Sequence, residues 1–242
     1  LCVAFLILVA LMLRAPFITY PNVTEYDEVT YANYAMHMVD GKPFVDIHPP
    51  LARILFAEVA RKSEPIATRA LDMTFNRPYG DFPIANERLL IALFGILLPL
   101  IFYAISRTLG SLPRVALLVG LFVATDNGMI IFSRVMLPDM LLLCFSFLAL
   151  LCILMFVRTK KNSLGLLIGA GVTIGLALSV KWTALGMLMV ILFTLLIHKR
   201  IGAALVVGTL ACFVYIVVFA SMLLVYFPFG GHASNFANEA DR

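Results

Sequence analysis

Residues 203–227, AALVVGTLACFVYIVVFASMLLVYF, decide the fold class of this chain. The run holds no charged residue and exceeds the roughly 20 apolar residues that a helix needs to cross the hydrocarbon core of a bilayer. Six further apolar runs cover residues 1–18, 88–106, 113–125, 135–157, 163–180 and 182–198. The sequence therefore predicts an all-α polytopic membrane protein with about seven transmembrane helices.

The third of these runs, 113–125, is short for a transmembrane helix. It either continues through Met129 to Phe132 or forms a tilted, broken segment.

The composition supports a membrane protein and argues against a soluble domain. Of 242 residues, 62% are hydrophobic and 13% are charged, against about 45–50% and about 25% in soluble domains. The net charge of +4 comes with no long basic run, which argues against a nucleic-acid partner. Because the chain begins with Leu1 and ends in a polar stretch at 235–242, we interpret it as a fragment, or as a chain trimmed at both ends.

Three short connections between the runs carry basic residues and no acids. Their basic residues are Arg107, Arg114, Arg158, Lys160, Lys161, Lys199 and Arg200. The positive-inside rule places these connections, and with them the N-terminus, in the cytoplasm. The opposite face is then outside the cell or in a lumen, and the protein is a multi-pass protein of a plasma or endoplasmic reticulum membrane.

All 14 acidic residues fall on that opposite face. Most lie between Glu25 and Glu87, and the others are Asp126, Asp139, Glu239 and Asp241. The adjacent pair Asp27 and Glu28 follows the first apolar run directly. Carboxylates with perturbed environments cluster at functional sites, although a solvated face or a plain helix cap would also explain acids here.

Residues 19–87 form a long first loop, and loops of this length usually carry structure or function. Apolar residues recur at helical spacing up to Val39 and stop at Gly41, which predicts one helix. A second helix is predicted to start at Pro50. Its apolar side would be Leu51, Ile54, Leu55 and Val59, and its polar side Arg53, Glu58, Arg61 and Lys62. Both helices are expected to lie at the membrane surface and wall a cavity.

Three cations come from different apolar segments yet reach the same predicted face. They are Arg88, Arg134 and Lys181. Such a set suits the phosphate of a lipid head group, where arginine binds in a bidentate manner and lysine acts as a point charge. Taken singly, each cation is equally well explained by snorkelling, and Trp182 by the aromatic belt of a membrane interface.

These residues together resemble the protein O-mannosyltransferase family, whose fold is the GT-C glycosyltransferase fold. The matching pieces are Arg14, Tyr26-Asp27-Glu28-Val29, Asp46-Ile47-His48-Pro49-Pro50-Leu51-Ala52-Arg53, Glu87-Arg88-Leu89, Asp126-Asn127, Ser133-Arg134, Leu137-Pro138-Asp139 and Ser179-Val180-Lys181-Trp182. They cover nearly the whole chain in order. Because members of the family continue with further transmembrane helices, the resemblance implies that residues 1–242 are the N-terminal transmembrane catalytic part of a longer protein. Ala52-Arg53 stands where the family often has Gly-Lys, and Pro138 where it often has Leu.

The resemblance implies transfer of mannose, with inversion, from a polyprenyl or dolichyl phosphate to Ser or Thr hydroxyls of proteins. A hydroxyl is a weak nucleophile, so a carboxylate must take its proton. The resemblance points to Asp27 as this base, with Glu28 shaping the charge or holding the acceptor. Arg88, Arg134 and Lys181 would stabilise the charge that develops on the leaving phosphate. Arg14, His48, Pro49, Asp126, Asp139 and Trp182 would support the site.

Beyond the lipid-linked sugar donor, the sequence implies no cofactor. It shows no dense metal-ligand cluster, and it leaves open a divalent ion near Asp27 and Glu28. Expected partners are the donor, a protein acceptor, membrane lipids, and a second subunit or the translocon. The main rival is a related GT-C transferase of the aminoarabinose type, which modifies a lipid or glycan. A transporter fits less well, since the centres of the apolar runs are almost uncharged.

Overall fold

The computed structural model describes residues 1–25, 27–42, 46–63, 78–79, 82–158 and 163–226. Every regular element within these ranges is an α-helix. The helices are α1 Cys2–Arg14, α2 Glu28–Val39, α3 Leu51–Lys62, α4 Ile84–Thr108, α5 Pro113–Thr125, α6 Asn127–Phe132, α7 Asp139–Arg158, α8 Leu164–Val180, α9 Ala184–Ile197 and α10 Ile201–Tyr226. Tyr26, Lys160, Lys161 and the acids at 239 and 241 lie outside the described residues.

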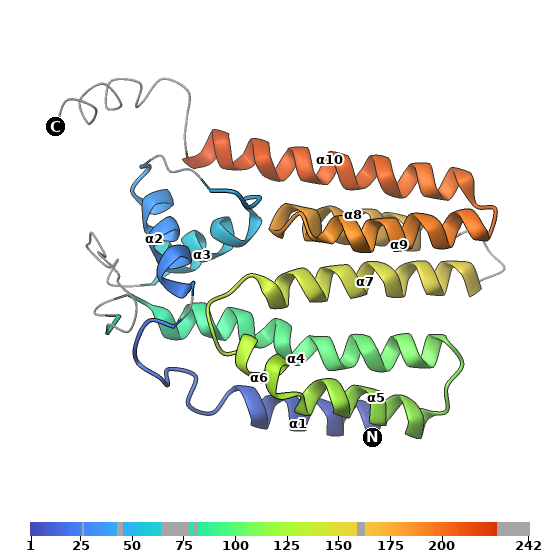
Figure 1. The fold of residues 1–242 in the computed structure, drawn as a ribbon, viewed down its shortest axis with the longest axis horizontal. Coiled ribbons are helices and arrows are strands. Elements are labelled where there is room, and N and C mark those ends of the chain that lie inside the picture. The colour runs from blue at the N-terminus through green and yellow to red at the C-terminus, as the bar shows by residue number, and fades with distance from the viewer. Residues whose placement is uncertain (26, 43–45, 64–77, 80–81, 159–162, 227–242) are drawn as a thin grey trace.

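The longer helices run side by side in one bundle, while α2 and α3 pack at one end of it (Figure 1). Within the bundle, α8 packs against α7 and α10, α4 packs against α5 and α7, and α1 lies against α4 and α5. The short turns that join α4 to α5 and α9 to α10 lie at the end away from α2 and α3 (Figure 1). The molecule therefore has two distinct ends, one with the loop helices and one with the basic connections.

Each of the seven predicted apolar runs contains an apolar helix, so the all-α prediction is confirmed. Three helices, α4, α7 and α10, are long and apolar enough to cross a membrane, with 25, 20 and 26 residues. The other four, α1, α5, α8 and α9, are apolar but shorter. The protein is an integral membrane protein, and the number of complete crossings stays a prediction.

The fourth run begins later as a helix than its apolar pattern predicts. Residues 135–138 are not helical, and α7 starts at Asp139, directly after Pro138. Proline lacks the N–H that a helix interior requires, so it suits a position just before the first turn. Within these non-helical residues, the N–H of Met136 donates to the carboxylate of Glu28 at the start of α2.

The third apolar run, 113–125, forms a helix that is interrupted at Asp126. This agrees with the prediction of a broken segment. Helix α5 ends at Thr125, and Asp126 has extended backbone. The Asp126 carboxylate accepts a hydrogen bond of 2.8 Å from the N–H of Met129 and caps the short helix α6. A capping aspartate satisfies a helix N–H that has no intrahelical partner, which favours a new helix start here.

Helices α2 and α3 confirm the two helices predicted in the first loop. Gly41 has φ +67° just after α2, a left-handed backbone that glycine adopts without strain. The predicted faces of α3 were wrong in part. Arg53 is buried with 4% of its surface exposed, together with Phe56 and Ala57. An ion pair with Asp46 at 2.7 Å neutralises this guanidinium, which explains how it can leave the polar face.

A close approach of backbones fixes α4 against the connection before α7. A Cβ atom at Gly95 would lie 2.3 Å from Cβ of Ser133 and 3.2 Å from Nε of Arg14. The first distance is shorter than any allowed carbon contact, so glycine is required at this point. The connection from α6 to α7 is thereby held against the middle of the bundle.

Candidate active site

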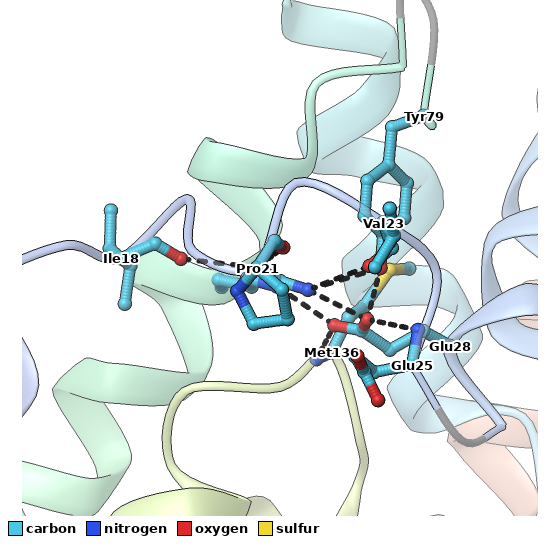
Figure 2. A network of polar contacts seen from close by, with 8 residues as sticks. Ile18, Pro21, Val23, Glu25, Glu28, Tyr79 and Met136 are labelled. Carbon is cyan, nitrogen blue, oxygen red and sulfur yellow. Dashed lines mark hydrogen bonds and ion pairs between the residues drawn. The ribbon is translucent and has the colours of Figure 1, made fainter. Parts of the chain in front are cut away.

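Glu28 lies at the centre of a buried polar network (Figure 2). Arg88 donates from Nε to Oε1 and from Nη2 to Oε2, both at 2.9 Å, in a bidentate ion pair. The hydroxyl of Tyr79 donates to Oε2. The backbone N–H groups of Glu25 and Met136 donate at 3.0 and 2.6 Å. Neither the Glu28 nor the Arg88 side chain has any exposed surface, so the ion pair is fully buried.

Arg88 also ties down the chain that leads from α1 to α2. Its Nη1 donates to the carbonyl of Pro21 at 2.9 Å and to that of Ile18 at 3.4 Å, and its Nη2 reaches the carbonyl of Val23 at 3.5 Å. A buried charge is tolerated only when it is paired and its donors are satisfied. Arg88 meets both conditions through Glu28 and these carbonyls, and it thereby sets the position of the next residues.

Asp27 precedes Glu28 but has a different environment. It occupies the position before the first residue of α2, yet its side chain makes no capping hydrogen bond. Its side chain is exposed and faces a cavity of about 350 Å³. The cavity is lined by Asp27, Thr30, Tyr31, Tyr34, Asp46, Ile47 and His48. A plain capping role therefore does not account for Asp27.

The opposite rim of this cavity is the segment before α3. Asp46 accepts from the N–H of His48 at 3.1 Å and pairs with Nη1 of Arg53 at 2.7 Å. Arg53 also donates to the carbonyl of His48 and lies 5.7 Å from the ring centre of Tyr34. Pro49 is buried directly behind His48. This arrangement presents His48 and Asp46 to the same space as Asp27.

Three carboxylates from different segments gather near Tyr31. Burial raises the pKa of Tyr31 above its ordinary value, and the negative charges of Asp46, Asp139 and Asp27 raise this pKa further. Asp139 begins α7, and its Oδ1 accepts from Nζ of Lys181 at 2.9 Å. Lys181, which directly follows the C-terminal end of α8, is thus held near the cavity through Asp139.

The connection 133–139 joins these parts. Nη2 of Arg134 donates to the carbonyls of Pro16 and Phe17, at 3.1 and 2.8 Å, just after α1. Two residues on, the N–H of Met136 binds Glu28 as described. The three predicted phosphate ligands therefore have different environments. Arg88 is buried in its ion pair with Glu28, and Arg134 donates to the backbone just after α1. Lys181 is paired with the carboxylate of Asp139.

Three predicted supporting residues lie away from the cavity. Arg14 is buried and donates from Nη1 to the carbonyl of Ala124 at 2.9 Å, so it caps the last turn of α5. Asp126 caps α6. Trp182 is 60% exposed and lines a separate apolar cavity of about 370 Å³ with residues such as Leu185.

The tyrosines of the site were not predicted from the sequence. Tyr31 and Tyr34 stand one helical turn apart on α2 and line the cavity, and this spacing was a usable signal. Tyr79 reaches Glu28 from the loop before α4. Burial raises the pKa of Tyr79, as does its hydrogen bond to Glu28, so it stays a donor. Nothing in its sequence neighbourhood signals this contact. Among the described ranges, no three His, Cys, Asp or Glu side chains lie together as metal ligands.

Comparison with known proteins places these features in a family. The sequence profile of the dolichyl-phosphate-mannose-protein mannosyltransferase family matches residues 4–237. Dolichyl-phosphate-mannose–protein mannosyltransferase 1 of Schizosaccharomyces pombe is 31% identical over 192 residues, which are 76% of this chain and 21% of that protein. The namesake in Saccharomyces cerevisiae is 29% identical over 192 residues, 76% of this chain and 23% of that protein.

A solved structure has the same fold. The S. cerevisiae protein O-mannosyltransferase Pmt1-Pmt2 complex bound to the sugar donor matches with a TM-score of 0.80 at 24% identity, over 93% of this chain and 33% of that one. The chain spans about a fifth to a third of the relatives it matches. With the profile matched along nearly its whole length, this chain belongs to the dolichyl-phosphate-mannose-protein mannosyltransferase family.

Proposed function

We propose that this chain forms the catalytic face of a membrane enzyme that transfers mannose from a dolichyl or polyprenyl phosphate to Ser or Thr hydroxyls of proteins. The observation that carries the proposal is Asp27, an exposed carboxylate without a capping bond, in a polar cavity beside the Glu28–Arg88 pair. Family membership supports the donor and the acceptor class. The solved relative is a two-protein complex, which supports a partner subunit here as well.

The chemistry asks for one accessible base. The acceptor hydroxyl attacks the anomeric carbon, the bond from that carbon to the phosphate oxygen breaks, and the hydroxyl proton passes to the base. Asp27 is placed to take this proton, since it is exposed to the cavity. Attack on the face opposite the leaving phosphate inverts the anomeric carbon. Glu28 is enclosed, and the groups that hold its carboxylate, on Arg88, Tyr79, Glu25 and Met136, do not line the cavity, so we assign it to positioning.

The leaving lipid phosphate needs cations and no general acid, because it is already a stable anion. Lys181 and Arg134 are the better candidates for direct contact, since Arg88 is enclosed by Glu28. Lys181 is 19% exposed and is held by Asp139 near the cavity. Within the part of the chain that the structure describes, Asp139 is its one side-chain partner, which leaves ammonium hydrogens for a phosphate oxygen. The charge distribution supports a reaction face away from the cytoplasm.

Replacing Lys181 by Met is expected to raise KM for the lipid donor about tenfold, the scale of one charge-assisted hydrogen bond. KM for the acceptor peptide should stay within about twofold of the native value. The matched control is Lys42→Met, because Lys42 is exposed and pairs with Asp40 outside the cavity. If the KM for the donor were unchanged in Lys181→Met, Lys181 would not be a ligand of the donor phosphate.

The function itself is tested by supplying the complete protein in membranes with radiolabelled dolichyl-phosphate mannose and a Ser/Thr-rich peptide. We expect the label to appear on the peptide and to be released by alkaline β-elimination, which cleaves O-linked sugars. Label on a lipid or glycan acceptor instead would favour the aminoarabinose-type alternative. Passage of a solute across vesicles without any sugar transfer would favour a transporter.

A further inference from the structure

A second polar cavity opens at the end of the bundle opposite α2 and α3. Its volume is about 360 Å³, and its walls come from the end of α7, the start of α8 and the turn between α9 and α10. The lining residues are Phe156, Leu164, Leu167, Lys199, Arg200, Ile201, Gly202 and Ala203. The start of α10 and the end of α7 lie far from α2 and α3 (Figure 1), so this cavity is separate from the Asp27 site.

The lining of this cavity has a charged part and an apolar part. Two cations, Lys199 and Arg200, stand on one wall, and the rest of the lining is apolar. The guanidinium of Arg200 lies 5.8 Å from the ring centre of Phe156, a buried ring with 3% exposure. This contact holds the guanidinium at the helix end. Lys199 has φ +56°, so the chain turns sharply where the two cations meet.

The surroundings favour an anion at this place. The connections at this end carry Arg107, Arg114 and Arg158 as well, and the sequence places no acid in any of them. A cavity of this size can hold a small polar group together with the start of an acyl chain. Basic pockets between membrane helices on the cytoplasmic side bind phosphate head groups. Orientation by the positive-inside rule alone would require the charges but not a cavity with an apolar wall.

We propose that this cavity binds the phosphate of an anionic phospholipid from the adjoining leaflet. Lys199 and Arg200 contact the phosphate, and the apolar wall formed by Leu164, Leu167 and Ile201 covers the first part of an acyl chain. The site is independent of the proposed transfer reaction, because it shares no residue with the Asp27 cavity. It would anchor the α9–α10 turn to the membrane surface.

The sharpest test adds bulk at the cavity lining and leaves every charge in place. Gly202 lines the cavity, and a Cβ atom there meets no other atom within 4 Å, so Gly202→Leu adds an apolar side chain without a clash. We expect it to raise the Kd for phosphatidylglycerol about tenfold or more, measured by native mass spectrometry of the complete protein in detergent with phosphatidylcholine as the comparison lipid. Lys199→Gln with Arg200→Gln should raise it about thirtyfold, from the loss of two cations near a lipid phosphate.

The matched control for Gly202→Leu is Gly208→Leu. Gly208 lies further along α10, and a Cβ there also meets nothing within 4 Å, but it does not line the cavity. For the charge variant, Arg107→Gln with Arg114→Gln removes two cations from the same end. Equal loss of lipid in a test variant and its control would overturn the proposal. So would displacement of phosphatidylglycerol by inorganic phosphate alone, which would mark a site for free phosphate. The melting temperatures of all four variants are measured to check that each is folded.

Discussion

Asp27→Asn is expected to lower the rate of mannosyl transfer about 10²-fold or more, the usual scale for a general base. The amide has nearly the shape of the carboxylate but cannot take the proton of the acceptor hydroxyl. Because the Asp27 side chain is exposed and makes no capping bond, the exchange should leave folding unaffected. Turnover is measured at saturating donor and peptide, and folding is followed by the melting temperature.

The control for this variant is Asp40→Asn at the other end of α2. Asp40 makes an exposed ion pair with Lys42 at 3.1 Å, so the same chemical change there should leave turnover within about twofold, as surface ion pairs contribute little. Near-native turnover of a folded Asp27→Asn protein would assign the base to another group. The next candidates would then be Asp46 and Asp139, whose negative charges also raise the pKa of Tyr31.

The helices were predictable because their signal is local. A run such as 203–227 is apolar over a length that only a membrane helix uses, and α10 covers nearly all of it. The ends were less predictable. Pro138 marked the true start of α7, but the apolar pattern continued through 135–138 and concealed it. Whether α5 continued or broke depended on one capping hydrogen bond at Asp126.

The different environments and proposed roles of Asp27 and Glu28 could not be predicted from the sequence. Asp27 and Glu28 are adjacent acids of similar chemistry, and the sequence placed both at the site. The difference arises from Arg88 and Tyr79, which lie more than 50 positions further along the chain and bind the carboxylate of Glu28. Likewise, the sequence predicted Arg53 on the polar side of its helix. Its burial is explained by the ion pair with Asp46, which the sequence did not reveal.

Glu28→Gln is expected to destabilise the protein strongly. The exchange leaves the Arg88 guanidinium buried without a counter-charge, and breaking a buried pair in this way costs about 3–5 kcal/mol. For a protein of this size the loss corresponds to a fall in melting temperature of roughly 10 °C. Turnover should fall together with stability, since Arg88 and Glu28 hold the chain from Ile18 to Val23 that leads to Asp27.

The reverse experiment separates charge from packing. Replacing both partners, Glu28→Leu with Arg88→Met, removes the unpaired charge, so the double variant should melt well above Glu28→Gln, because apolar substitutes for a buried pair are often tolerated. Its turnover should nevertheless stay low, because the hydrogen bonds to the α1–α2 chain and to Met136 are lost. Arg61→Gln, which breaks the exposed pair with Glu58, should barely change the melting temperature. A double variant that regained turnover with stability would show that the pair supports the fold alone and does not position Asp27.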